Sequence, residues 1–331
     1  MTPVRRTPLR PVALSIGGRT HVVHLKLEGA NPCGSLKDRT AQSLLDDLDE
    51  RGLLARESIL VESTSGNLGI ALASLARRRG HCFVAVIDPK TTPENAARLQ
   101  SLGARIELVD RPDPGGGYLL ARIDRVRRLC ASSPDYVWPD QYANPANPRA
   151  HEQGTAPELL DQLGESPDAV LVPVSTGGTL AGIARFFRRE SPATRIVAVD
   201  AQGSIALGGS PGPRLLTGIG AGKPSAFATP DLYDERVVVG DAEAFAACRV
   251  LAASTGIQVG GSSGATLAAC ARLLAREPEL ERVACICPDG GRSYRSTIYS
   301  DGWLARNGIR LSFADLGPLQ DVAPAEALVP A

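Results

Sequence analysis

The chain has 331 residues, of which 43% are hydrophobic and 22% charged, as is usual for a globular protein. Lys and Arg together number 36, and so do Asp and Glu, so the formal net charge is zero. This balance excludes the basic footprint of a nucleic-acid binder, and no apolar run reaches membrane-spanning length. The first residues lack the apolar core of a signal peptide, and we expect a cytoplasmic protein.

Short apolar runs alternate with helical patterns along most of the chain, which predicts right-handed βαβ units and largely parallel sheets. The predicted strands are 22–27, 58–62, 83–87, 105–109, 169–174, 195–200, 236–239 and 283–287. The predicted helices are 35–51, 68–79, 93–102, 118–130, 151–163, 179–189, 241–255, 264–275 and 294–307. Two similar blocks, 58–137 and 169–287, predict two doubly wound α/β domains that face a cleft.

The segment 26–39 holds the residue on which we expect the chemistry to depend. A turn at 31–34 is followed by Ser35, a good N-cap, so Lys37 should lie in the first turn of a helix. The positive end of the helix dipole favours the neutral amine, which is the form that attacks an aldehyde. Four lysines stand against thirty-two arginines, and Arg cannot supply a titratable amine. A solvated first-turn lysine explains the local pattern equally well.

Loops rich in glycine and hydroxyl groups follow three predicted strands. The first, 63–69, has hydroxyls and an amide at a helix start, which favours an anion site over an ordinary capped turn. The second, 175–179, has the pattern of a phosphate cradle but lacks the lysine of a nucleotide P-loop and the glycine spacing of a dinucleotide site. The third, 259–265, presents a serine pair.

These features together fit one cofactor, pyridoxal 5'-phosphate (PLP). Its aldehyde requires a lysine, its phosphate a cradle, its ring nitrogen a hydroxyl and its phenol oxygen an amide.

The seven cysteines are scattered, and most lie in apolar runs, which indicates buried free thiols. Cys285 and Cys287 have no second pair or nearby histidine, so we expect no metal site. His151 opens a predicted helix and is interpreted as structural.

From about residue 7 to residue 307 the chain resembles the fold-type-II PLP family of cysteine synthase and cystathionine β-synthase. The motifs that carry the resemblance are 26–39, 64–67, 141–147, 175–179 and 261–264. The resemblance implies a fold like that of the tryptophan synthase β-subunit, with the cofactor in the cleft between two domains. The smaller, mobile domain would comprise 42–143, the larger would comprise 1–41 and 144–312, and a tail, 313–331, is expected to be disordered. It also implies a homodimer.

The resemblance assigns roles to individual residues. Lys37 would bind the cofactor aldehyde covalently and then serve as general base, Asn67 would bond the phenol oxygen, and Ser262 would face the pyridine nitrogen. The phosphate would lie against Ser175, Thr176, Gly177, Gly178 and Thr179. The substrate carboxylate would be received by Ser63, Thr64, Ser65 and Gln141. A serine at the ring nitrogen leaves the pyridine unprotonated, which favours β-elimination over racemisation or transamination.

Departures from the sulfhydrylases narrow the expected activity. Ser175 and Tyr142 stand where those enzymes usually have glycine and phenylalanine, and both add a hydroxyl. Stretches such as 88–95 and 138–142 are similar to a branch that joins O-phospho-L-serine to L-glutamate. Its product, N-(2-amino-2-carboxyethyl)-L-glutamate, leads to 2,3-diaminopropionate for siderophores or peptide antibiotics. Arg122 is our candidate cation for the departing phosphate, and a solvated helix face is the alternative.

Three alternatives remain open. A cysteine synthase that uses sulfide would need less room for its second substrate. A nicotinamide-dependent oxidoreductase built on the same βαβ units predicts no visible absorbance from the protein itself. A non-catalytic scaffold for a synthetase predicts that Lys37→Ala leaves function intact.

Overall fold

The computed structural model describes residues 5–113, 116–311 and 319–321. Its strands are β1 (Leu9–Ile16), β2 (Arg19–Leu27), β3 (Ile59–Ser63), β4 (Cys82–Ile87), β5 (Arg105–Leu108), β6 (Tyr136–Val137), β7 (Ala169–Pro173), β8 (Arg195–Ala201), β9 (Glu235–Val239), β10 (Val283–Cys287) and β11 (Leu319–Asp321). Its α-helices are α1 (Lys37–Glu50), α2 (Asn67–Arg79), α3 (Pro93–Ser101), α4 (Leu119–Ser132), α5 (Ala146–Ala150), α6 (Ala156–Leu163), α7 (Gly178–Glu190), α8 (Asp241–Thr255), α9 (Gly261–Arg276) and α10 (Asp301–Arg306).

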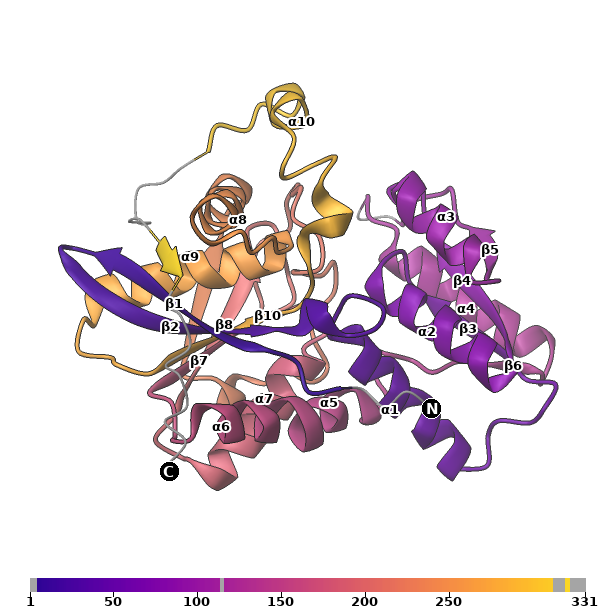
Figure 1. The fold of residues 1–331 in the computed structure, drawn as a ribbon. Helices are drawn as coiled ribbons and strands as arrows, with labels where there is room; N and C mark the ends of the chain where they lie inside the picture. Colours follow the sequence, from indigo (N-terminus) through magenta and orange to yellow (C-terminus); the bar gives the residue numbers. More distant parts are fainter. Residues whose placement is uncertain (1–4, 114–115, 312–318, 322–331) are drawn as a thin grey trace, which may run out of the picture.

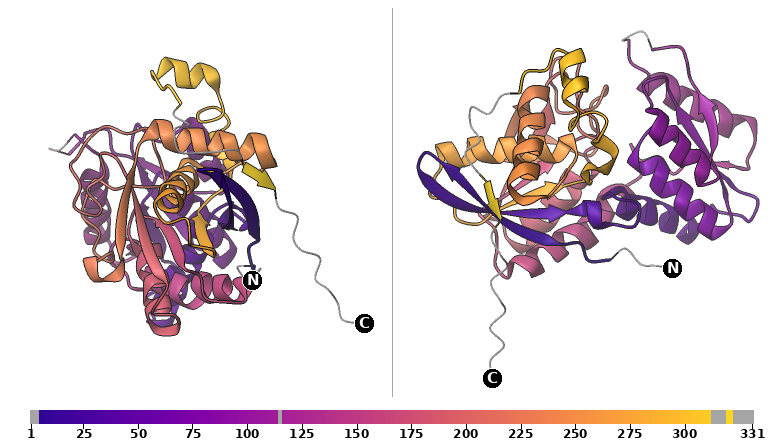
Figure 2. Two further views of the ribbon diagram at one scale, coloured as in Figure 1. Left: turned by 90° about the vertical axis from the view of Figure 1, so that its left-hand side faces the viewer. Right: turned by 45° about the horizontal axis from the view of Figure 1, so that its top comes forward.

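The strands form two separate sheets, so the molecule has two lobes that lie side by side (Figures 1 and 2). The small lobe contains the four-stranded sheet β5-β4-β3-β6, in which all strands are parallel. Helices α1 and α2 pack on one face of this sheet and α4 on the other. Strands β3 and β4 are therefore covered on both faces, which explains their continuous apolar runs.

The large lobe contains the seven-stranded sheet β11-β1-β2-β10-β7-β8-β9. Strands β1 and β2 form an antiparallel hairpin. Strands β2, β10, β7, β8 and β9 are parallel to one another. Gly17 and Gly18 have φ angles of 57° and 81°, which the tight turn between β1 and β2 requires. Helices α8 and α9 cover one face, and α6 and α7 cover the other. The sheet thus has the two buried faces of a doubly wound fold.

A buried ion network joins β2, α1 and α6. Lys26 and Glu28 are fully buried, and Arg39 is 7% exposed. Arg39 Nε lies 2.8 Å from Glu28 Oε2, and Arg39 Nη1 lies 2.9 Å from Glu158 Oε2. Glu158 also pairs with Lys26 at 2.5 Å. Each buried charge therefore has an opposite partner, as low dielectric surroundings demand.

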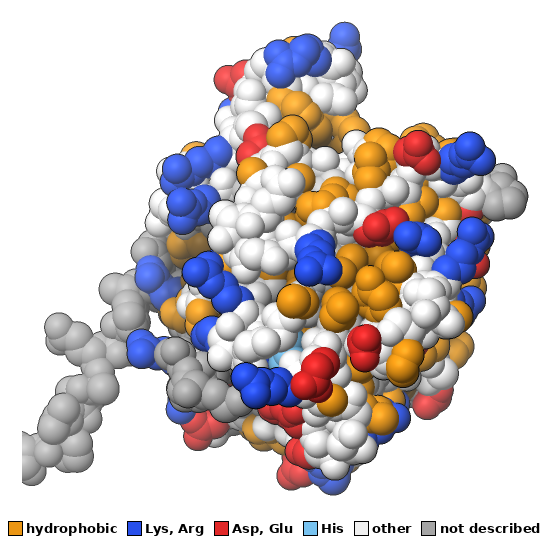
Figure 3. Space-filling view, turned by 90° about the vertical axis from the view of Figure 1, so that its right-hand side faces the viewer, with side chains coloured by type: hydrophobic (Ala, Val, Ile, Leu, Met, Phe, Trp, Pro, Cys, Tyr) orange, Lys and Arg blue, Asp and Glu red, His pale blue; other side chains and the backbone are white. Residues whose placement is uncertain are grey.

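Figure 3 shows the outer face of the small lobe in a space-filling view. Apolar side chains gather there among scattered Lys, Arg, Asp and Glu. Within the described residues, every helix is too short or too polar to cross a bilayer.

All the predicted strands are confirmed, with boundaries that differ by at most a few residues. The predicted helix 294–307 is wrong: a 3-10 turn, Gly291–Tyr294, comes first, and α10 begins only after Ser300, whose Oγ accepts the Trp303 N–H at 3.3 Å. The predicted helix 151–163 begins as one turn of π-helix, His151–Thr155.

Strand β11 lies in the tail for which we expected disorder. It pairs antiparallel with β1, Val12 standing opposite Asp321, so the expectation does not hold for these three residues. Residues 313–318 and 322–331 of the same tail lie outside the described residues.

Candidate active site

A cavity of about 490 Å³ lies between the lobes, at the carboxyl ends of parallel strands. Its wall is formed by the start of α1, the loops after β3 and β7, the start of α9 and the loop after β10. Such a junction is where α/β sheets bind ligands. The predicted site residues on this wall are Lys37, Ser63, Thr64, Ser65, Asn67, Arg122, Gln141, Tyr142, Ser175, Thr176, Gly177, Thr179 and Ser262. Gly178 does not line it.

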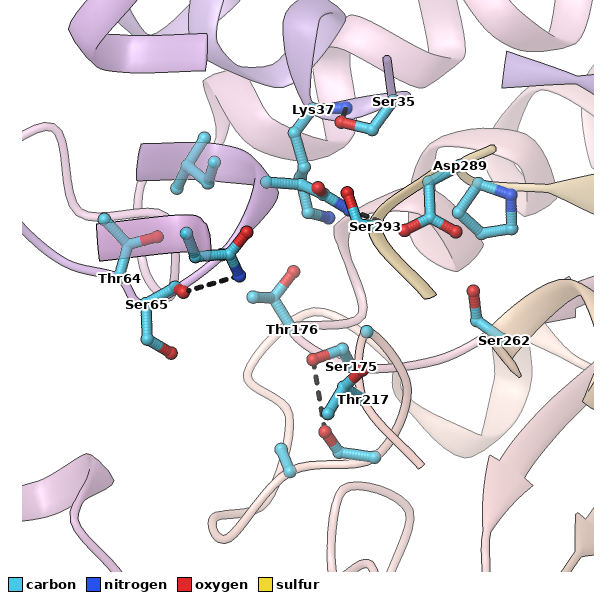
Figure 4. Close-up of a pocket in the computed structure, with 18 of the residues that line it drawn as sticks. Ser35, Lys37, Thr64, Ser65, Ser175, Thr176, Thr217, Ser262, Asp289 and Ser293 are labelled. Atoms are coloured by element: carbon cyan, nitrogen blue, oxygen red, sulfur yellow. Dashed lines mark hydrogen bonds between the residues drawn. The ribbon is translucent and has the colours of Figure 1, made fainter. Parts of the chain in front are cut away.

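Lys37 is the first residue of α1, and its side chain extends into the cavity (Figure 4). The predicted N-cap is wrong, because Leu36 occupies that position with φ −59° and ψ −16°. Ser35 Oγ nevertheless accepts the Lys37 N–H at 3.2 Å. Burial lowers the pKa of Lys37 to about 8, and the nearby Asp289 carboxylate partly offsets this effect. A neutral amine is thus accessible near neutral pH, as a carbonyl-reactive lysine requires.

Asp289, which our sequence analysis missed, connects the two lobes at the cavity wall. Its Oδ2 accepts hydrogen bonds from Asn67 Nδ2 at 2.7 Å and from Tyr294 Oη at 2.6 Å. Burial raises the pKa of Asp289, although these donors and Lys37 act against the rise. Figure 4 shows Asp289 beside the same space as Lys37 and Ser262. Asp289 follows the carboxyl end of β10, so the rule that selected the other loops would also have selected this one.

The loop between β7 and α7 has the backbone shape of an anion cradle. Gly177 has a φ angle of 89°, and a Cβ on it would lie 2.0 Å from Ser225 Oγ. A Cβ on Gly178 would lie 2.2 Å from Asn147 Oδ1. Asn147 Nδ2 donates to Thr176 Oγ1 at 3.1 Å, and Ser225 Oγ donates to Thr176 O at 2.7 Å. Only glycine therefore fits at either position. The loop leads directly into the start of α7, and the N-terminus of a helix favours an anion.

Two buried hydroxyls of the cavity wall have no hydrogen-bond partner within the described chain. They are Ser262 Oγ, at the start of α9, and Ser63 Oγ, at the end of β3. A buried hydroxyl without a partner costs stability, so both groups fit a site whose hydrogen bonds are completed by a bound molecule.

Arg122 is buried and Tyr142 is half-buried, and both line the same cavity. The Arg122 side chain is 11% exposed, and its Nε lies 3.3 Å from Asp88 Oδ2. The contact of Nε with Asp88 is an ion pair without hydrogen-bond geometry, and Nη1 of Arg122 has no hydrogen-bond partner within the described chain. Burial raises the pKa of Tyr142 to about 12, with Arg122 acting in the opposite direction. Arg122 is thus a buried cation with donors to spare, and the alternative of a solvated helix face is wrong.

Glu62 holds together the two loops expected to receive a carboxylate. It is fully buried at the end of β3. Its Oε1 accepts from Trp138 Nε1 at 3.1 Å and from the Ser63 N–H at 2.9 Å, and its Oε2 accepts from the Gln141 N–H at 3.1 Å. Gln141 Nε2 also donates to Ser63 O at 3.1 Å. Burial raises the pKa of Glu62 to about 7 in spite of these donors.

His151 is buried and contacts the cradle at Thr179. Its Nε2 lies 3.3 Å from Thr179 Oγ1 and 3.2 Å from Thr40 Oγ1, and its Nδ1 lies 2.9 Å from Thr155 Oγ1. Burial lowers the pKa of His151 well below its ordinary value. A neutral imidazole that contacts three hydroxyls agrees with the structural role that we assigned to it.

The lysine, the cradle and the unsatisfied hydroxyls match the aldehyde, the phosphate and the polar ring atoms of PLP. Together with two α/β lobes around one cleft, they define the class of the protein as a fold-type-II PLP-dependent enzyme.

Comparison with known proteins agrees with this class. The family model described as "Pyridoxal-phosphate dependent enzyme" matches residues 1–289, and the chain belongs to that family. Its cofactor is PLP. Two curated relatives are named N-(2-amino-2-carboxyethyl)-L-glutamate synthase. That of Ralstonia nicotianae is 45% identical over 91% of this chain and 89% of the relative, and that of Cupriavidus metallidurans is 41% identical over 99% and 96%.

Solved structures show the same fold. The O-acetylserine-dependent cystathionine β-synthase of Helicobacter pylori is 33% identical, with a TM-score of 0.82 over 90% of this chain and 97% of that chain. An O-ureido-L-serine synthase is 31% identical, with a TM-score of 0.79 over 91% and 97%. The chain is thus a PLP-dependent synthase of the β-replacement type.

Proposed function

We propose that the enzyme replaces the phosphate of O-phospho-L-serine by the amine of L-glutamate. The products are N-(2-amino-2-carboxyethyl)-L-glutamate and phosphate. The observation that carries the proposal is the name shared by two relatives that match nearly the whole chain at 41–45% identity.

Buried Arg122 supports O-phosphoserine as the first substrate. A departing phosphate carries two negative charges, and a guanidinium with unused donors stabilises that charge as it develops. Tyr142 adds a hydroxyl to the cavity, and Ser175 adds another, which now donates to Gly220 O at 3.2 Å. An acetate leaving group would not require a cation in this position.

Other residues that line the cavity fit the remaining tasks. When bound, PLP supplies an aldehyde for the substrate nitrogen and an electron sink for the carbanion at Cα. Lys37, with its lowered pKa, takes the proton from Cα and later returns it. The hydroxyls of 63–65 and the amide of Gln141 hold the substrate carboxylate. The hydroxyl of Ser262, which has no partner within the described chain, would hold the ring nitrogen.

The proposal includes movement of residues 42–143 as a unit toward the rest of the chain. In support, the cavity is lined from both lobes, and Asn67 of the small lobe bonds Asp289 of the large lobe at 2.7 Å. Closure would exclude water from the reacting β-carbon. Hydrogen exchange with and without O-phospho-L-serine tests this, because closure slows exchange in the loops after β3 and β4. Equal exchange rates would contradict it.

We further propose that the enzyme is a cytoplasmic homodimer. All seven cysteines are free thiols, and several are buried, as suits a reducing compartment. Light scattering tests the dimer, and a monomeric mass at micromolar concentration would rule it out.

The decisive experiment is to give the purified holoenzyme pairs of substrates and identify the products by mass spectrometry. We expect O-phospho-L-serine with L-glutamate to yield the conjugate together with one phosphate for each product molecule. Formation of cysteine alone, from sulfide with either O-phosphoserine or O-acetylserine, would identify a cysteine synthase instead.

Variants of α4 test the leaving-group site separately. Arg122→Ala should lower kcat/KM for O-phospho-L-serine by about 100-fold or more, since a charge-assisted contact in the transition state is lost. Arg128→Ala, which removes an exposed arginine from the same helix, is the matched control. Equal effects of the two substitutions would refute the role of Arg122.

A further inference from the structure

The cavity wall has more positively charged side chains than are needed to bind the cofactor and the first substrate. Its cations are Lys37, Lys90, Arg122 and Arg214, and its carboxylate is Asp289. The cradle holds phosphate through neutral groups, Lys37 is committed to the cofactor, and Arg122 faces the leaving group. Lys90 is exposed, and its Nζ lies 5.7 Å from the centroid of the Tyr118 ring. Arg214 is therefore the cation left for a second negatively charged substrate.

Arg214 is held in place by its own backbone segment. It lies in the long connection between β8 and β9, and the next two N–H groups, of Leu215 and Leu216, donate to the Asp241 carboxylate at 2.8 and 2.9 Å. Asp241 is the first residue of α8, so this segment is fixed to a helix start. The guanidinium is therefore presented from a rigid support.

The Arg214 guanidinium is half-buried, and within the described chain no carboxylate pairs with it. Its Nη1 donates to Gly203 O at 3.1 Å, which leaves its other donors available. Burial lowers the pKa of Arg214, and Asp200 and Asp241 offset this only in part. A partly desolvated guanidinium of this kind gains most from a carboxylate that arrives with a ligand.

Apolar side chains continue the wall beside Arg214. They are Leu215, Phe245, Ile298 and Trp303, and the rings of Phe245 and Trp303 pack edge to face with their centroids 5.9 Å apart. Methylene groups fit against such a surface, and a carboxylate at their end would meet the cation. The combination matches the side chain of an acidic amino acid with an aliphatic stem.

We propose that Arg214 binds the γ-carboxylate of the attacking L-glutamate, with the apolar wall beside it holding the two methylene groups. This inference rests on the proposed function and adds to it the residue that selects the nucleophile. Binding there leaves the glutamate amine free to approach the β-carbon. L-Glutamine, which lacks the charge, and L-aspartate, which is one methylene shorter, are then poor substrates.

The test compares nucleophiles on each enzyme preparation, with O-phospho-L-serine saturating. For the holoenzyme and for Arg214→Met, Arg214→Lys and Lys90→Met, kcat/KM is measured with L-glutamate and with L-glutamine. The ratio of the two values is the readout, because cofactor loading and folding affect both equally. We expect Arg214→Met to lower this ratio by about 10- to 100-fold, Arg214→Lys to lower it less, and Lys90→Met to preserve it.

An unchanged ratio in Arg214→Met would overturn the assignment. So would a ratio that falls in Lys90→Met and not in Arg214→Met, because the selecting cation would then belong to the small lobe. If the unmodified enzyme forms no conjugate with L-glutamate, the proposed function itself is rejected. The two failures are therefore distinguished by the wild-type product analysis.

Discussion

Replacing Glu62 by Gln tests the electrostatics beneath the carboxylate-binding loops. Glu62 is fully buried and receives three N–H donors. No cation among the described residues pairs with it, and Asp140 acts further against its ionisation. Burial therefore raises its pKa from an ordinary 4.5 to about 7. Glu62→Gln keeps the shape of the side chain and removes its titration.

The size and sign of the effect follow from proton linkage. As pH rises above 4.5, Glu62 loses its proton first in the unfolded chain, so the folded state binds more protons and becomes less stable with increasing pH. The contribution of Glu62 is present in full below pH 4.5 and is lost as pH rises through about 7. Between about pH 5 and about pH 8 the loss integrates to about 2–3 kcal/mol.

Urea denaturation at a series of pH values, followed by tryptophan fluorescence with PLP present, measures this loss. The stability of Glu62→Gln minus that of the wild type should increase by about 2–3 kcal/mol from about pH 5 to about pH 8. The glutamine also disturbs the local hydrogen bonds, but that cost is the same at every pH and cancels. Glu57→Gln, which changes an exposed carboxylate just before β3, is the control. A difference that stays constant with pH would refute the reasoning.

Three further predictions concern the framework of the site. Gly182→Ala should destabilise the fold by about 1–3 kcal/mol, because the new Cβ would lie 2.2 Å from Pro148 O. The control Gly302→Ala, whose Cβ would meet only the end of a flexible arginine, should change stability by less than about 0.5 kcal/mol. Urea denaturation compares the two variants, and equal values would contradict the clash. Glu28→Gln should cost about 3 kcal/mol in the same assay, since it leaves the buried guanidinium of Arg39 with one carboxylate partner fewer, and an unchanged midpoint would disprove that dependence. The rate at which apoenzyme acquires borohydride-reducible PLP should rise roughly tenfold per pH unit up to about 8 and then level off, as the Lys37 amine becomes neutral; a rate independent of pH would argue against the lowered pKa.

Much of the fold could be predicted because its parallel strands are buried on both faces. Such strands appear in the sequence as short continuous apolar runs, and all eight that we predicted are present. Strand β1 was missed because only Val12 and Leu14 of its residues are fully buried, so its pattern is weak. The pair Gly17-Gly18 after it was a usable hairpin signal.

The loops of the site could be predicted because chemistry gathers where parallel strands end. That rule selects Asn67, the cradle and Ser262, which all lie around one cavity. It does not reach Arg214, which lies in a connection of about thirty residues without periodicity, held by a distant carboxylate. Arg122 could be identified as a candidate, but its burial depends on packing between α4 and β3 that no local pattern encodes.

Local signals also failed where tertiary contacts compete with them. Ser35 has the residue type of an N-cap, yet Leu36 takes the cap position. Ser35 lies in an isolated bridge opposite Asp289, where Leu36 N–H donates to Pro288 O at 2.8 Å and Gly290 N–H donates to Gly34 O at 3.4 Å. The segment before α10 has helical spacing, but Ser300 caps a new helix there, and Tyr294 and Tyr299 turn inward to bond Asp289 and Val259. Such competition is visible only once the strands have been assembled.

The position of β10 in the large sheet has a consequence for biosynthesis. This strand stands between β2 and β7, although it is nearly the last of the three-hundred-residue core to be made. A nascent chain that emerges from the ribosome with β2 and β7 complete still lacks the strand that joins them. One edge of β2, the strand that precedes the segment bearing Lys37, therefore stays unpaired until β10 has emerged. The sheet that carries the site is therefore completed only after β10 has been made, and until then the edges of β2 and β7 are surfaces that a chaperone would have to shield.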